Sequence, residues 1–193
     1  MATGKDRPRR ADAVANGRRI VEAAVTCLSR DPGASVSRIA QEAGVGRVTL
    51  YGHFPSREAL VEAAMVQILA DGEVVLSGID LDGDPIAALS ALIESSWQLV
   101  ADGQAVLEAA EESLPPGRVQ ELHARPADRL AGLIRRGQVE GVLRDDLPTE
   151  WMVSSAHHLI HGAAADVRAG RIDETDAPRL ITSTVVAAFA TGR

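Results

Sequence analysis

Apolar residues recur at intervals of three and four along most of the chain, which is the spacing of helices with one buried face. In the first such helix, expected from about Ala11 to Arg30, this spacing relates Ile20, Ala24 and Leu28. Residues that favour strands are sparse, whereas Ala, Leu, Glu and Arg are common. The pattern therefore predicts an all-α protein.

Two short helices follow the first one and are separated by a glycine. Ser35 can cap the first of them, and Gly44 ends it. The next helix runs from about Arg47 to Phe54, where Pro55 stops it. Two short helices joined by a tight glycine turn are the plan of a helix-turn-helix, whose second helix enters the major groove of DNA. The pattern therefore predicts a three-helix DNA-binding domain over residues 11–60.

The remaining residues, 61–193, predict a larger helical domain. Asp84 can cap a helix that reaches about Ala101, and a separate helix is expected from Gln104 to Leu114. A long helix is expected over residues 149–169, and the last over residues 178–190. This domain is expected to bind a ligand and to form a dimer.

Charge divides the chain in the same way. Residues 1–60 carry ten basic and six acidic residues, a net charge of +4, whereas residues 61–193 carry ten and twenty-one, a net charge of −11. A basic N-terminal region followed by an acidic remainder favours contact between the basic region and a polyanion. Residues 1–10 are expected to be a disordered basic tail, whose arginines either reach an adjacent minor groove or stay solvated.

The remaining composition points to the cytoplasm. The single cysteine, Cys27, forms no intrachain disulfide, which fits a reducing compartment. No apolar run reaches the roughly 18 residues of a membrane span, and the charged start lacks the apolar core of a secretory signal. Neither a phosphate-binding loop nor a dinucleotide fingerprint is present, so no cofactor is expected.

The third helix carries the candidate DNA contacts. Leu50 and Phe54 are expected to hold this helix to the rest of the domain, so that its other side chains project outward. Arg47 stands near its front, where an arginine can bind guanine O6 and N7. Tyr51 and His53 have polar tips that can reach phosphates. The alternative is a structural three-helix unit whose exposed side chains bind nothing.

The stretch IAQEAGVGRVTLYGHFPSREAL, residues 39–60, resembles the tetracycline-repressor (TetR) family of bacterial transcription regulators. Its Ile-Ala, Ala-Gly-Val, Thr-Leu-Tyr and His-Phe positions stand in the register of that family, and the similarity spans roughly residues 16–65. The resemblance implies a ligand-responsive regulator, most often a repressor, that binds a palindromic DNA operator as a dimer. We expect the regulator to leave the operator when it binds a small apolar molecule.

The resemblance also implies roles for individual side chains. Gly46 departs from the serine or threonine usual in the family, which removes a helix cap and a phosphate contact. Arg57 replaces the usual lysine and keeps its positive charge. The residues implied to face bases are Arg47, Val48 and Gly52, those implied to contact phosphates are Thr49, Tyr51 and His53, and Ser37 and Arg57 complete the expected DNA-binding set.

The last two helices are the expected dimer interface. A dimer is expected because a palindromic operator requires two DNA-binding domains related by a two-fold axis. The first of them carries residues 162–165, Gly-Ala-Ala-Ala, whose small side chains permit close helix approach. The second carries the stripe Ile181, Val185 and Phe189, which either joins the interface or belongs to the core of one chain. In TetR-like proteins these two helices form a four-helix bundle across the dimer.

The two tryptophans suggest an apolar effector pocket in a chain with few aromatic residues. Trp97, Leu107 and Trp151 are the expected lining, and filling of the core is an equal alternative for each of them. His157 and His161, one helical turn apart, are expected to face this pocket or the dimer interface.

The same histidines raise an alternative function. The spacing of His157 and His161 can chelate zinc, but the run HHLIH lacks the glutamate of an HEXXH protease and has no cysteine pair nearby. No metal is therefore expected. The alternative to a DNA-binding regulator is a metal-dependent helical hydrolase that uses His157, His158 and His161.

Overall fold

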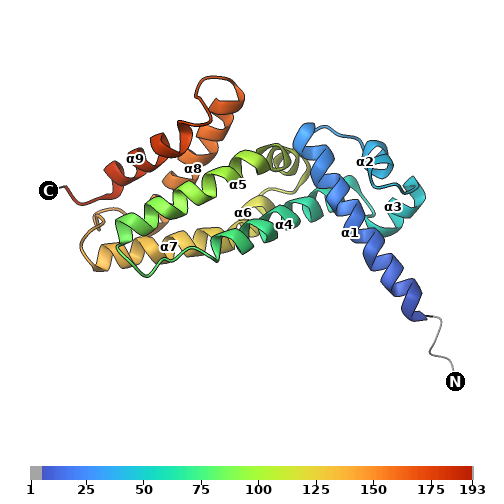
Figure 1. Cartoon of the computed structure of the whole chain (residues 1–193), viewed down its shortest axis with the longest axis horizontal. Helices are drawn as coiled ribbons and strands as arrows, with labels where there is room; N and C mark the ends of the chain where they lie inside the picture. Colours follow the sequence, from blue (N-terminus) through green and yellow to red (C-terminus); the bar gives the residue numbers. More distant parts are fainter. Residues whose placement is uncertain (1–5, 193) are drawn as a thin grey trace. The chain divides into compact units, whose positions relative to one another are not determined.

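The computed structural model describes residues 6–192 and the side chains of residues 12–192. Over this range the chain forms helices and no strand, as the sequence predicts (Figure 1). In chain order the helices are α1 (Asp6–Arg30), α2 (Val36–Glu42), α3 (Arg47–His53), α4 (Arg57–Leu76), α5 (Pro85–Ser113), α6 (Arg118–Leu122), α7 (Ala124–Val139), α8 (Thr149–Arg168) and α9 (Ala177–Phe189).

The first helix begins earlier than expected, at Asp6 rather than at about Ala11. The second half of the expected tail of residues 1–10 is therefore helical, and residues 1–5 lie outside the described part of the chain. The side chains of the tail's arginines also lie outside it, so that their contact with a minor groove stays a prediction.

The described residues divide into two compact units. The first extends to Leu69 and includes Ala105–Val119, and the second contains Ala70–Gln104 and the residues from Gln120 onward. The expected boundary after residue 60 falls inside α4. The two helices expected between Asp84 and Leu114 are the single helix α5, because Gly103 is buried in its middle without interrupting it. Tertiary packing here outweighs the low helix propensity of glycine.

In the first unit, α1, α2 and α3 pack against one another. The predicted cap of α2 forms, because the Ser35 hydroxyl accepts the Arg38 N–H at 3.2 Å. The Ser56 hydroxyl likewise accepts the Ala59 N–H at 3.2 Å at the start of α4. Apolar side chains from each helix close the core. Its largest fully buried members are Ile20, Leu28, Ile39, Leu50, Leu60, Val61 and Val106.

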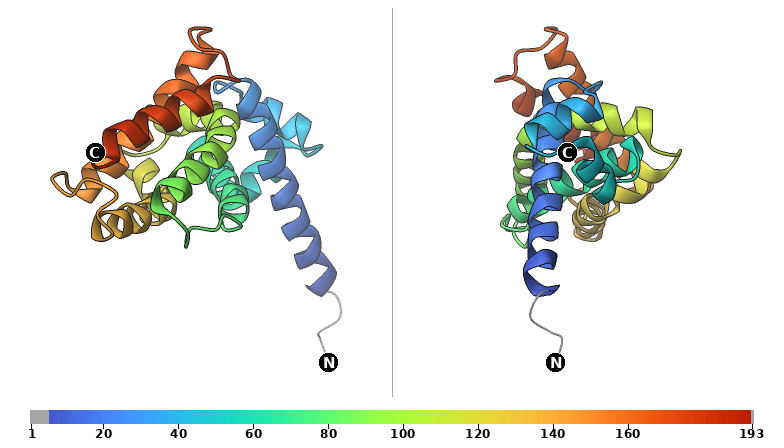
Figure 2. Two further views of the ribbon diagram at one scale, coloured as in Figure 1. Left: turned by 60° about the vertical axis from the view of Figure 1, so that its left-hand side comes forward. Right: turned by 90° about the vertical axis from the view of Figure 1, so that its right-hand side faces the viewer.

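In the second unit, α8 lies between α7 and α9 and contacts both of them (Figure 2). The Asp84 carboxylate accepts the Ala87 N–H at 2.8 Å and caps α5, as predicted. None of the described helices combines the length and apolarity needed to cross a membrane. The core of this unit includes Leu89, Ile93, Trp97, Ile134, Leu143, Met152, Ile181, Val185 and Phe189.

Gly137 of α7 provides a stability prediction, because a side chain does not fit there. An added Cβ would lie 2.6 Å from Cδ1 of the buried Leu143 side chain. We expect Gly137→Ala to lower the free energy of unfolding by about 1–3 kcal/mol, the usual cost of overpacking. Thermal melts followed by circular dichroism should show a fall of about 2–4 °C for each kcal/mol.

Gly132 in the same helix is the matched control for Gly137. An added Cβ at Gly132 meets nothing within 4 Å. The substitution Gly132→Ala should therefore raise stability by up to about 1 kcal/mol through helix propensity alone. Equal melting temperatures for the two variants would contradict the close packing of Gly137 against Leu143.

Candidate nucleic-acid interface and effector region

A tight turn sets the position of α3 relative to α2. Gly44 has φ +66°, a left-handed conformation that favours glycine, and the Val45 N–H donates to the Ala40 carbonyl at 3.0 Å. Gly46 has an extended backbone and provides no side-chain cap for α3, as its identity predicts. Leu50 is fully buried and anchors α3 to the unit. The turn and this anchor leave Arg47, Val48, Thr49, Tyr51 and Gly52 exposed.

The exposed side of α3 contains most of the predicted DNA contacts. Val48 is 88% exposed and Tyr51 is 41% exposed, although both are large apolar or aromatic side chains. Arg47, Thr49 and Gly52 are exposed as well. Valine side chains are usually buried, but Val48 has no such packing in the described chain. A valine methyl group suits contact with the methyl group of thymine.

Arg47 and Tyr51 form one feature of this surface. They are one helical turn apart, and the Arg47 guanidinium carbon lies 6.0 Å from the centre of the Tyr51 ring. This contact keeps the cation and the phenol on the same side of α3. Arg47 and Tyr51 are therefore placed to contact a guanine edge and a neighbouring phosphate.

The next two residues lie closer to the body of the domain. His53 is half-buried, and its Nδ1 lies 3.5 Å from the position of a Cβ on Gly17, so the imidazole packs over α1. Phe54 is half-buried as well, and not a core residue as predicted. It lies at the end of α3, where the backbone is extended and no longer helical.

Arg57 is engaged inside the first unit. Its Nη1 donates to the Ala34 carbonyl at 2.6 Å and its Nη2 to the Pro32 carbonyl at 2.8 Å. These bonds tie the start of α4 to the turn between α1 and α2, which gives Arg57 a structural role that the sequence did not indicate. Ser37 is exposed on α2. The predicted phosphate contacts of both residues stay predictions.

The three residues predicted to line an effector pocket have different surroundings in the structure. Trp97 is 2% exposed and packs in the core of the second unit. Leu107 is buried and belongs to the first unit. Trp151, at the start of α8, is 61% exposed, so it lies on the surface of its unit. Core filling, the alternative for Trp97, is what the structure supports.

His157 and His161 do lie together, and a third histidine that the sequence did not indicate joins them. His123 directly precedes α7, and α7 packs against α8. Burial and the neighbouring imidazoles lower the pKa of His157 and the pKa of His161 to about 4 each, so both rings are neutral at pH 7. His158 is exposed and its Nδ1 lies 2.7 Å from the Ser154 carbonyl oxygen.

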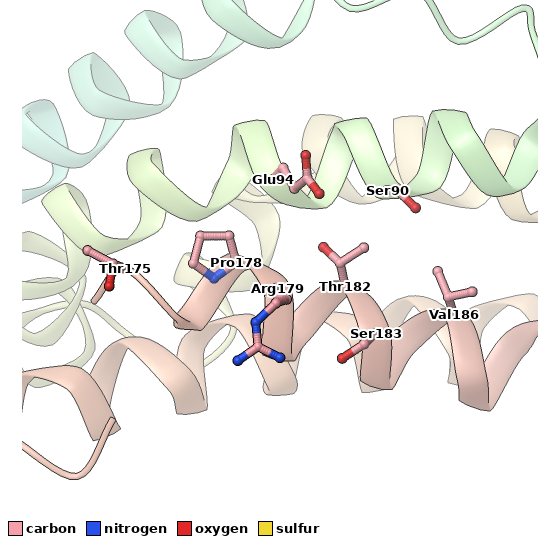
Figure 3. Close-up of a pocket in the computed structure, with 8 residues that line it drawn as sticks. All are labelled: Ser90, Glu94, Thr175, Pro178, Arg179, Thr182, Ser183 and Val186. Carbon is pink, nitrogen blue, oxygen red and sulfur yellow. The ribbon is translucent and has the colours of Figure 1, made fainter. Parts of the chain in front are cut away.

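A shallow groove lies between α5 and α9 in the second unit. Figure 3 shows Ser90 and Glu94 of α5 facing the side chains of α9. The groove contains none of the predicted effector residues. Its full lining is Ser90, Glu94, Thr175, Pro178, Arg179, Thr182, Ser183 and Val186.

The stripe of α9 is buried within one chain. Ile181 and Phe189 are at most 4% exposed and Val185 is fully buried, all in contact with the core of the second unit. The structure therefore supports the intrachain alternative for this stripe. The residues of α8 and α9 that remain accessible lie on other faces, and include Leu159, Gly162 and Leu180.

The first unit matches a known family. Residues 20–64 fit the family described as bacterial regulatory proteins, tetR family. The match covers the second half of α1, both short helices and the start of α4. It therefore contains every residue of the candidate DNA-binding surface.

Solved structures resemble the chain over nearly its whole length. A TetR-family transcriptional regulator from Agrobacterium tumefaciens is 23% identical, with a TM-score of 0.73 over 93% of this chain and 100% of that one. The fatty acid degradation regulator FadR from Bacillus halodurans is 17% identical, with a TM-score of 0.72 over 88% of this chain and 94% of that one. No curated protein matches the sequence.

These findings decide between the two functional classes raised by the sequence. TetR-family regulators are DNA-binding transcription factors and not enzymes, so the hydrolase alternative is set aside. The helix-turn-helix of residues 20–64 matches the family, and the all-helical fold resembles a solved TetR-family regulator over 93% of the chain. Residues 20–64 thus match the tetR family of bacterial regulatory proteins, and the chain shares its fold with solved TetR-family regulators.

Proposed function

We propose that the protein is a ligand-responsive repressor that binds a palindromic operator as a homodimer. The observation that carries this proposal is the outward face of α3, where Val48 is 88% exposed beside Arg47 and Tyr51. An apolar methyl, a guanidinium and a phenol on one short helix match the chemistry of a thymine methyl, a guanine edge and a phosphate. A cytoplasmic location follows, since the operator is there.

The homodimer is proposed to form through the outer faces of α8 and α9. TetR-family regulators are typically dimeric, and this pair of helices was predicted for the interface from its small residues. Because the stripe of Ile181 and Val185 is buried, the contact is proposed to use the accessible side, with Gly162 on α8 and Leu180 on α9. Gly162 has open space in front of it, which lets another helix approach closely.

The effector is proposed to be a small, largely apolar molecule bound by the second unit. One relative of similar fold is a fatty acid degradation regulator, which is consistent with that class. The effector would act by binding more tightly to one conformation of the dimer. In that conformation the distance between the two DNA-binding domains no longer matches the distance between the operator half-sites. Its differential affinity for the two conformations sets the largest possible loss of operator binding.

Selection of bound sequences from a random DNA pool tests the proposal. We expect one enriched palindrome whose half-sites are about 34–36 Å apart or a multiple of that distance. Fluorescence anisotropy on this palindrome should show an affinity constant that falls linearly with salt on logarithmic axes. Enrichment of no sequence, or of a site without two-fold symmetry, would contradict a dimeric operator-binding regulator.

A further inference from the structure

Three of the five histidines in the chain meet in the second unit. His157 and His161 are one turn apart on α8, and their ring centres are 4.6 Å apart. The ring of His123 lies 5.3 Å from that of His157 and 6.1 Å from that of His161. One ring nitrogen from each of the three lies within 4.8 Å of the others.

The spacing of these nitrogens is close to that of a metal site. Three nitrogens about 2.0–2.1 Å from a tetrahedral zinc ion are about 3.4 Å from one another. The nitrogens of His123, His157 and His161 would therefore have to approach by at most about 1.4 Å, which small side-chain rotations provide. Two of the three ligands are fixed on one helix face, so only His123 must be brought in by packing.

A buried glutamine supports one of these histidines from behind. Gln104 of α5 is 8% exposed, and among residues 12–192 it is the only polar side chain that is buried. Its Oε1 lies 3.3 Å from Nδ1 of His161. An amide oxygen can only accept, so Nδ1 of His161 must donate, and the lone pair of His161 is left on Nε2. Protein metal sites use such partners to fix the tautomer and the direction of a ligand histidine.

We propose that His123, His157 and His161 bind a divalent transition-metal ion of the zinc class. Three imidazoles without a carboxylate suit Zn²⁺, Co²⁺, Ni²⁺ or Cu²⁺ and do not suit Mg²⁺ or Ca²⁺, which prefer oxygen ligands. Three protein ligands leave a fourth position open for water or for a bound small molecule. The sequence alone predicts no metal because its third ligand, His123, is far from the HHLIH run and is joined to it only by the fold.

Titration of the full-length, untagged and chelator-treated protein with Zn²⁺ tests the site. Calorimetry should give one ion per chain, and Co²⁺ should give the visible absorption of a four-coordinate complex. His123→Ala, His157→Ala and His161→Ala should each weaken Zn²⁺ binding by more than about 100-fold, because each removes one of three ligands. Gln104→Leu should weaken it by about 10–100-fold, since it removes the acceptor that orients His161.

His158→Ala is the matched control, because His158 lies in the same HHLIH run but points to the backbone of its own helix. This variant should keep the wild-type affinity for Zn²⁺. Should an alanine variant fail to fold, His157→Gln and His161→Gln keep the side-chain volume and remove the imidazole. The absence of a one-to-one Zn²⁺ complex, or an equal loss on changing His158, would overturn the proposal. The test uses no DNA, so its outcome is independent of operator binding.

Discussion

The double substitution Arg47→Ala and Tyr51→Ala is expected to abolish specific operator binding and leave the fold intact. A bidentate contact between arginine and guanine contributes about 1–3 kcal/mol of discrimination. A dimer makes this contact twice, so the loss of Arg47 alone corresponds to about 2–6 kcal/mol, or about 30-fold to 10⁴-fold in affinity. Loss of Tyr51 adds to this, which would bring binding close to the non-specific level. Fluorescence anisotropy on the selected operator measures the change.

The stability of the double variant should match the wild type, because both side chains are exposed and their contact is a surface one. Arg135→Ala is the charge-matched control, since Arg135 is exposed on α7 in the second unit. It should change operator affinity by less than about 3-fold, because Arg135 is not part of the candidate DNA-binding surface. A folded double variant that binds the operator with wild-type affinity would show that α3 does not read this DNA.

Local features of the helix-turn-helix could be read from the sequence because they depend on neighbours along the chain. Ser35 caps α2, Gly44 lies in the turn where α2 ends, and Gly46 leaves α3 without a side-chain cap, each as predicted. The positions of Phe54 and Arg57 could not be read in this way. The backbone at the end of α3 determines the position of Phe54. Carbonyl groups between α1 and α2 determine the position of Arg57.

The second unit was predictable as a set of helices but not as a set of sites. Trp97 and Trp151 are chemically identical, yet packing buries the first in the core and leaves the second on the surface. His123 enters the cluster of His157 and His161 only because α7 packs on α8. Periodicity gives the buried face of a helix, but it does not say whether that face meets the same chain or another.

The substitution Gly162→Arg is expected to convert the proposed dimer into a monomer. Gly162 is exposed on α8, and an added Cβ there meets nothing within 4 Å, so an arginine fits without disturbing its own chain. Helix propensity should even raise the stability of the chain by up to about 1 kcal/mol. At a helix-helix interface built on small residues, however, the arginine would hold the partner away and bury a charge.

Two measurements follow the consequences of Gly162→Arg. Light scattering coupled to size exclusion should report half of the wild-type mass. Affinity for the palindrome should fall by at least about 10³-fold, toward non-specific binding, since each monomer meets only one half-site. Gly132→Arg makes the same substitution at an open position of α7 and should stay dimeric. A folded Gly162→Arg protein with the wild-type mass would place the dimer interface elsewhere, because no close approach at Gly162 could then hold the two chains together.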